Sequence, residues 1–117
     1  IPKYTYLSLT FEFIVATINH ADGDISYDEA KSQRNQITRG LPFSLVTHLD
    51  WDTALMREDT RRDYGERRFF VLGRIAGRLH ALVFTPRQDR VHVISLRKAN
   101  SREVHLYEQT QATPPCG

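Results

Sequence analysis

The sequence predicts an α+β domain, in which an antiparallel β-sheet is preceded by two helices and followed by one. Three runs rich in β-branched and aromatic residues, at 65–74, 77–84 and 90–99, are each bounded by turn residues. The linkers at 75–77 and 85–89 are short enough to join antiparallel neighbours, so the three runs predict a meander. Helix-start and helix-stop signals on both sides of this block predict the helices that pack on the sheet.

Length and composition predict one soluble domain. The 117 residues suffice for a single hydrophobic core, and 40% hydrophobic with 26% charged residues is typical of a globular protein. No apolar run is long enough to cross a bilayer, since the most apolar early stretch, 7–18, is interrupted by Glu12. That stretch also lacks the cleavage pattern of a signal peptide. We therefore expect a cytoplasmic protein with no membrane partner.

The residue types that usually hold metals are scattered along the chain. Cys116 is the one cysteine, so no intrachain disulfide can form. The five histidines show no pairing at metal-ligand spacing. We expect neither a structural metal nor a cofactor.

The first 24 residues carry no recognisable chemistry. Apolar residues from Tyr4 to Val15 suggest a strand, although the run at 13–18 could equally form a helix, and 19–24 has the composition of a loop.

The first helix of the domain is predicted to follow a short extended entry at 25–27 and to end at Arg39. Asp28 or Ser26 can cap it, and Gly40 supplies a left-handed stop. A narrow apolar stripe predicts a surface helix with one face on the sheet; it consists of Tyr27, Ala30, Ile37 and Leu41. A second row at four-residue spacing, which we expect to be solvated, consists of Lys31, Asn35 and Arg39.

A shorter helix is predicted over 41–49, with Pro42 near its first turn. Its residues Phe43, Val46 and Leu49 are three apart and should point to the core. A strand over 50–56 and a charged, mobile loop over 57–64 then lead into the meander.

The last helix is predicted from a capping box formed by Asn100 and Glu103. Val104 and Tyr107 should face inward, the helix should end near Ala112, and 113–117 should form a disordered tail.

Positive charge is concentrated in the second half of the chain. Residues 61–117 carry eleven Lys and Arg against five Asp and Glu, whereas residues 1–60 carry five against nine. Cations at the strand ends would attract a polyanion, but arginines also keep exposed strand edges soluble, and charge alone does not decide between these roles. The cations concerned are Arg67, Arg68, Arg74, Arg78, Arg90, Arg97 and Lys98.

Short motifs occur in a fixed order between residues 25 and 109. They are Tyr27-Asp28-Glu29-Ala30-Lys31 with Asn35, Arg39-Gly40-Leu41-Pro42-Phe43, Gly65-Glu66-Arg67-Arg68-Phe69 with Gly73, Gly77-Arg78-Leu79, and Ile94-Ser95-Leu96-Arg97-Lys98-Ala99 with Arg102, Glu103 and Tyr107. No single motif is specific, but together they resemble the BrnT family of bacterial type II toxins, which look like compact RelE-like ribonucleases. The resemblance implies a toxin domain at 25–112 and leaves 1–24 as an extension outside the family pattern.

What the resemblance implies is a toxin that cleaves RNA, inhibits translation and so arrests growth. In RelE-like enzymes the proposed reaction is metal-independent: the ribose 2′-hydroxyl attacks the adjacent phosphate and leaves a cyclic phosphate. The implied partner is a ribbon-helix-helix antitoxin of the BrnA type, through which the complex would bind operator DNA.

Three positions depart from the family pattern. Tyr27 stands where the family usually has Trp, Leu96 where it has Ala, and Arg39 where it has His. The last exchange affects chemistry, because arginine remains protonated near neutral pH and cannot act as a general base.

The catalytic candidates are Arg68, Arg97, Glu66 and Arg39. Arg68 and Arg97 can each hold phosphate oxygens bidentately. Glu66 could serve as a base, although a structural ion pair with Arg68 is an equal alternative. Arg39 could reach the same groove from the first helix.

The RNA-binding candidates are Lys31, Arg67, Ser95 and Lys98, and Ser95 should share a strand face with Arg97. His80 and His92 would be tempting bases, but they lie outside the family motifs, and we interpret both as solvent-facing strand residues. Glu103 and Tyr107 are interpreted as capping and packing residues.

A second class of function is open at this point. The same basic sheet could bind RNA or an antitoxin without cleaving anything, particularly if Arg39 replaces a necessary imidazole. A degenerate remnant that serves only as the antitoxin's partner is a third alternative.

Overall fold

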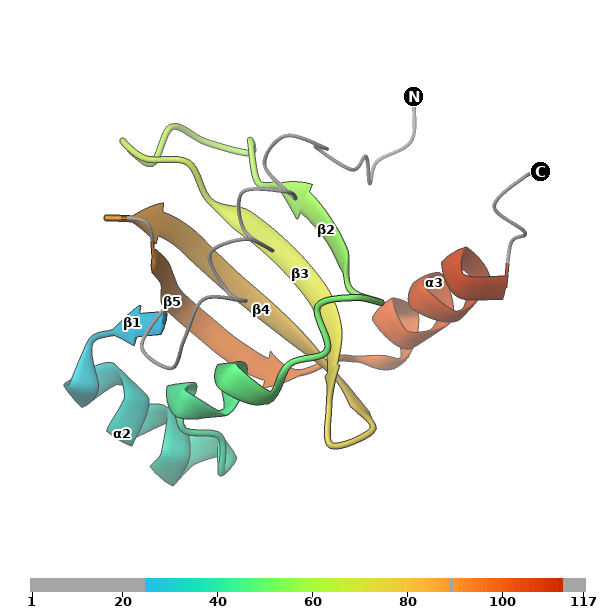
Figure 1. The fold of residues 1–117 in the computed structure, drawn as a ribbon, viewed down its shortest axis with the longest axis horizontal. Helices are drawn as coiled ribbons and strands as arrows, with labels where there is room; N and C mark the ends of the chain where they lie inside the picture. The colour runs from blue at the N-terminus through green and yellow to red at the C-terminus, as the bar shows by residue number, and fades with distance from the viewer. Residues whose placement is uncertain (1–24, 89, 113–117) are drawn as a thin grey trace.

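The computed structural model describes residues 25–88 and 90–112, and it confirms the α+β class. A single five-stranded sheet with the order β1-β5-β4-β3-β2 is accompanied by helices (Figure 1). The predictions for 1–24 and 113–117 lie outside the described residues. The elements are β1 (Ile25–Tyr27), α2 (Glu29–Arg39), the 3-10 helix η1 (Phe43–His48), β2 (Leu55–Glu58), β3 (Phe69–Ile75), β4 (Arg78–Arg87), β5 (Arg90–Lys98) and α3 (Ser101–Ala112).

The sheet is mixed, so the expectation of a purely antiparallel sheet is wrong at one edge. β1 pairs in parallel with β5, with Ile25 opposite Val91 and Tyr27 opposite Val93. A parallel neighbour needs a long crossover, and here nearly the whole domain intervenes between the two strands. The three-residue length of β1 gives no pattern from which its partner could be predicted.

The three-stranded meander of β3, β4 and β5 is confirmed. Ala76 and Gly77 join β3 to β4 with φ angles of 51° and 79°, the geometry of the tight turns that match strand twist. β4 runs to Arg87, beyond the predicted end at residue 84. Beyond Phe84, β4 pairs with β5 alone, so Pro86 interrupts no ladder to β3.

β2 begins later than predicted, at Leu55 rather than at residue 50. The Asp50 carboxylate accepts hydrogen bonds from the Asp52 amide (3.1 Å) and the Thr53 hydroxyl (3.0 Å), which folds this segment into a turn. The charged segment that follows is anchored by Asp59, whose buried carboxylate accepts from Arg61 and from the Tyr64 hydroxyl.

A bulge in β5 decides which side chains share a sheet face. Phe84 of β4 lies opposite Val93, but its neighbour Val83 lies opposite Ser95, so Ile94 is the extra residue. His92 and Arg97 are five residues apart and would point to opposite faces of a regular strand. The bulge brings them to the same face.

One sheet face is covered by η1 and the segments beside it. Phe43, Val46 and Leu49 are buried at 2%, 0% and 5% exposure, which confirms their predicted core positions. The helix predicted over 41–49 is a six-residue 3-10 helix, Phe43–His48. Leu49 packs directly on β3, where a Cβ at Gly73 would lie 2.9 Å from its Cδ2 atom.

The opposite face is partly covered by α3, which begins just after β5 ends (Figure 1). Tyr107 is 2% exposed and packs with Leu72, Leu79 and Ala81, and Val104 packs against the same cluster. The predicted capping box is confirmed, because the Asn100 side chain accepts from the Glu103 amide (2.8 Å) and Glu103 accepts from the Asn100 amide (2.9 Å). No helix among the described residues is long and apolar enough to cross a membrane.

α2 is held by polar contacts; its predicted apolar stripe is confirmed at the flanking Tyr27 and Leu41 but is wrong at Ala30 and Ile37 within the helix. Asp28 caps the helix and Gly40 ends it in the left-handed conformation, as predicted. Ile37, however, is 84% exposed, whereas Asn35 is buried and donates to the carbonyls of Leu41 (2.6 Å) and Leu96 (2.9 Å). β1 pairs only with residues 91–93, so it does not reach the Leu96 carbonyl. The side-chain amide of Asn35 on α2 donates to that carbonyl instead.

Candidate functional site

The sheet face that carries α3 also carries four of the eight candidate residues, Glu66, Arg68, Ser95 and Arg97, and we call it the arginine face. Directly opposed residues on antiparallel strands point to the same side. One row runs from Arg57 through Phe70 and Val83 to Ser95, and a neighbouring row places Ala81 beside Arg97. The prediction that Ser95 and Arg97 share a face is thereby confirmed. The polar and charged residues of this face and those between them are Arg57, Arg68, Phe70, Val83, Arg87, His92, Ser95 and Arg97.

Arg97 lies where α3 begins and is held by Glu103. Two guanidinium nitrogens donate to the two carboxylate oxygens at 2.8 and 2.9 Å. This bidentate pair lowers the pKa of Glu103 and raises that of Arg97, through the hydrogen bonds between them. Glu103 therefore both caps α3 and orients Arg97. The interpretation of Glu103 as a capping residue is confirmed but incomplete.

A second group of charges lies further along the same face. The Arg87 guanidinium donates to the Glu66 carboxylate at 3.2 to 3.4 Å, while Arg68 lies 4.0 Å from the same carboxylate. Arg68 also stacks over the ring of Tyr64, 4.2 Å from its centroid. Glu66 thus has two arginine neighbours, of which sequence reasoning named only Arg68.

His92 belongs to this second group, and its interpretation as a solvent-facing residue is wrong. It is half-buried, and its Nδ1 atom shares a 2.9 Å hydrogen bond with the Ser26 hydroxyl on β1. Burial lowers the pKa of His92, as do the positive charges of Arg87 and Lys31, while Glu66 and Asp28 oppose this shift. We call Ser26, Glu66, Arg68, Arg87 and His92 the His92 cluster.

The His92 cluster and the Arg97–Glu103 pair are separate on the arginine face. Arg97 lies opposite Ala81 and His92 opposite Thr85, four residues apart along β4. At the rise of a β-strand this corresponds to roughly 13 Å. The two groups could therefore contact different phosphates of one extended strand.

The remaining sequence candidates lie elsewhere. Arg39 donates to the Leu96 carbonyl (3.3 Å) and to Asn35, at the outer edge of β5. Arg67 forms a bidentate pair with Glu58 at 3.0 Å and lies over the Phe69 ring, on the side of the sheet opposite the arginine face. Lys98 is exposed at the end of β5.

The exposed Lys31 side chain on α2 affects the pKa of His92, so its charge lies near the His92 cluster. Sequence reasoning missed Ser26 and Arg87, because only strand pairing and register bring them to this cluster.

His80, the other strand histidine, is also not solvent-facing. It is 4% exposed, and its Nδ1 atom lies 2.7 Å from the Arg78 carbonyl oxygen. Burial is the main cause of its lowered pKa. Substrate could not reach this imidazole without local opening.

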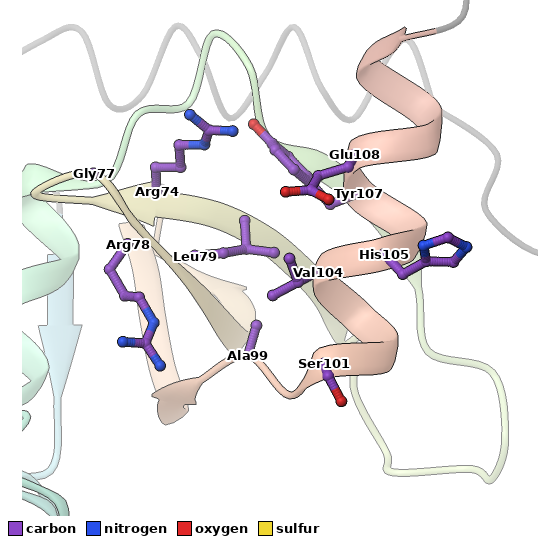
Figure 2. A pocket seen from close by; sticks show the side chains of 10 residues that line it. All are labelled: Arg74, Gly77, Arg78, Leu79, Ala99, Ser101, Val104, His105, Tyr107 and Glu108. Atoms are coloured by element: carbon purple, nitrogen blue, oxygen red, sulfur yellow. The ribbon is translucent and has the colours of Figure 1, made fainter.

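A hollow of about 700 Å³ lies between the β3–β4 turn and α3. Figure 2 shows Arg74 and Tyr107 close together at its rim, where the guanidinium lies 5.3 Å from the ring centroid, and His105 on the outer side of the helix. None of the predicted site residues lines this hollow.

Arginines beside a carboxylate and a neutral imidazole form a surface suited to phosphate groups, since guanidinium binds phosphate bidentately and imidazole can exchange a proton. The fold and this face together indicate a small basic protein that acts on a phosphate-bearing polymer. A family model described as "Ribonuclease toxin, BrnT, of type II toxin-antitoxin system" matches residues 27–103. The chain therefore belongs to the BrnT family of ribonuclease toxins. No curated protein and no solved structure matches it.

Proposed function

We propose that this protein is a metal-independent endoribonuclease that cleaves RNA, inhibits translation and arrests growth in the cytoplasm. Its substrate bond is the phosphodiester beside a ribose 2′-hydroxyl. The 2′-oxygen attacks phosphorus, the bond to the 5′-oxygen breaks, and a cyclic phosphate and a free 5′-hydroxyl are left. This reaction needs a base for the 2′-hydroxyl, cations around the pentacoordinate phosphorus, and a proton for the leaving oxygen.

The observation that carries this proposal is that three arginines of the arginine face are held in place. Arg68 directly precedes β3, Arg87 ends β4 and Arg97 lies on β5, and each is held by a carboxylate or an aromatic ring. Guanidinium groups fixed in this way need little reorganisation to stabilise developing negative charge. Two of them flank Glu66, which would hold them at a set separation.

The proposed partner is a ribbon-helix-helix antitoxin of the BrnA type, which would silence the toxin and bind operator DNA on behalf of the complex. Family membership implies an antitoxin, and the arginine face offers a surface for one. An acidic or apolar antitoxin segment laid over this face would exclude RNA.

A catalytically impaired module that binds RNA or antitoxin is the second candidate. The observation that favours it is the position of Arg39, whose guanidinium is engaged by the Leu96 carbonyl and by Asn35. In that position Arg39 supports the sheet edge and supplies no base.

Inducible expression with mapping of new RNA ends tests the proposal. We expect the native chain to arrest growth and to create new RNA ends, and we expect Arg97→Ala to abolish both. Arg102→Ala is the matched control, because it removes the same charge from an exposed position on α3. Absence of arrest and of RNA ends in the native chain, with both appearing in Arg39→His, would establish the binding module instead.

A further inference from the structure

The proposed cleavage needs a group that accepts the 2′-hydroxyl proton, and the arginines of the face cannot do so because they remain protonated. Glu66 is engaged by Arg87, with hydrogen bonds at 3.2 to 3.4 Å, and lies 4.0 Å from Arg68. Both oxygens of this carboxylate already accept hydrogen bonds from Arg87, so its lone pairs are engaged in the ion pair rather than turned to a substrate hydroxyl. The proton acceptor must therefore be sought beyond the charged pairs.

The structure describes four histidines, and three of them are unsuited to this role. His80 is buried at the far end of β4. His48 is exposed in η1, which packs on the opposite face of the sheet. His105 is exposed on the outer side of α3 (Figure 2).

His92 has the position and the orientation of a general base. Its side chain projects from β5 onto the arginine face, beside Thr85 of β4 and Ser26 of β1. The 2.9 Å contact with Ser26 engages Nδ1 and fixes the ring. When Nδ1–H donates to the serine hydroxyl, the free lone pair is on Nε2.

The charges around His92 are those that phosphoryl chemistry requires. Arg87 and Lys31 act on it from β4 and α2, and Glu66 and Asp28 act from the segments before β3 and α2. The two cations disfavour protonation of the imidazole and would also attract a phosphate to the same place. The neutral ring thus lies beside an anion-binding position.

We propose that His92 is the general base of this ribonuclease, positioned by Ser26, with Arg87 and Arg68 as the cations that bind the scissile phosphate. This role rests on the proposed function and supplies the proton acceptor that the cleavage reaction needs. Nε2 takes the proton of the 2′-hydroxyl while the bond from the 2′-oxygen to phosphorus forms. The bond from phosphorus to the 5′-oxygen breaks, that oxygen receives a proton from water, and the imidazolium gives its proton to the hydroxide that remains.

The role of His92 predicts how activity depends on pH. Only the neutral imidazole accepts a proton, and burial together with Arg87 and Lys31 lowers the pKa of His92 below its ordinary value. The cleavage rate should therefore be on its plateau at neutral pH and should fall about tenfold per pH unit only once the pH is below the lowered pKa.

The decisive variant is His92→Asn, whose side-chain amide can still donate to Ser26 but cannot accept a proton. His48→Asn is the matched control at an exposed site on the opposite side of the sheet. The assay is single-turnover cleavage, by the purified full chain, of a 5′-labelled RNA that contains a site mapped by the growth experiment. RNA affinity and melting temperature are measured on the same samples.

We expect His92→Asn to lose roughly 10²- to 10⁴-fold in cleavage rate with RNA affinity changed less than about threefold. A native chain that cleaves, with His92→Asn equally active, would overturn the role of His92 and leave the ribonuclease intact. A native chain that binds RNA without cleaving it would overturn the proposed function as well. If His92→Asn does not fold, the pH profile of the native chain decides: an acid limb supports the role, and a profile that stays flat down to the pH at which the chain unfolds refutes it.

Discussion

Glu103→Gln separates two roles that the native carboxylate combines. The amide oxygen of glutamine can still accept from the Asn100 backbone, because glutamine serves as well at this capping-box position. The charged bidentate pair with Arg97, at 2.8 and 2.9 Å, is lost. The Arg97 side chain is 38% exposed and that of Glu103 14%, so solvent screens the pair and its removal should cost about 1 kcal/mol.

For a domain of this size that loss corresponds to a melting temperature about 4 °C lower. Glu103→Ala removes the cap as well and should cost about 2 kcal/mol in total. Thermal unfolding at pH 7 and low salt measures both variants. Glu108→Gln, on the exposed side of the same helix, is the control for loss of a carboxylate.

Acid should abolish the difference between the native chain and Glu103→Gln. The hydrogen bond from Arg97 depresses the pKa of Glu103 in the folded state. A depressed pKa contributes stability above the unfolded value, about 4.3, and that contribution is lost as the pH falls through the folded value. Equal melting temperatures for the two proteins at pH 7 would refute the assigned strength of the pair. A difference that persists at pH 2 would refute its electrostatic origin.

Two further substitutions test the packing that holds the site. Gly73→Ala places a Cβ 2.9 Å from the Leu49 side chain, and urea unfolding should show a loss of about 1 to 3 kcal/mol; unchanged stability would mean that η1 shifts freely. Asn35→Ala removes the donor to the Leu41 carbonyl, leaves the Leu96 carbonyl with only its 3.3 Å hydrogen bond from Arg39, and should cost about 2 kcal/mol. Hydrogen exchange that remains as slow in β5 as in the native chain would contradict that reasoning.

Local signals were sufficient for much of the fold. The caps of α2 and α3 and the tight turn at Ala76 and Gly77 each depend on residues close together in the chain. The spacing of Phe43 and Val46 likewise identified the face of η1 that is buried. Such features can be predicted because the interaction and the sequence pattern lie within the same few residues.

Features that depend on distant partners were not predicted. Asn35 is buried because it donates to the Leu96 carbonyl of β5, which β1 does not reach. Nothing in the sequence around Asn35 indicates that this carbonyl lacks a strand partner. Ile37 was assigned to the core from its apolar character, yet the helix turns that side to solvent. In both cases a tertiary backbone contact outweighed the local pattern.

The sequence alone determined that this is an α+β domain, that positive charge gathers on its strands, and that its motifs are those of a BrnT toxin. Only the tertiary structure decided which candidates meet. The bulge at Ile94 places His92 on the same face as Arg97, and the parallel pairing of β1 brings Ser26 to its ring. Side-chain direction alternates along a strand, so one extra residue changes the composition of a whole face, and no local pattern in β5 reveals it.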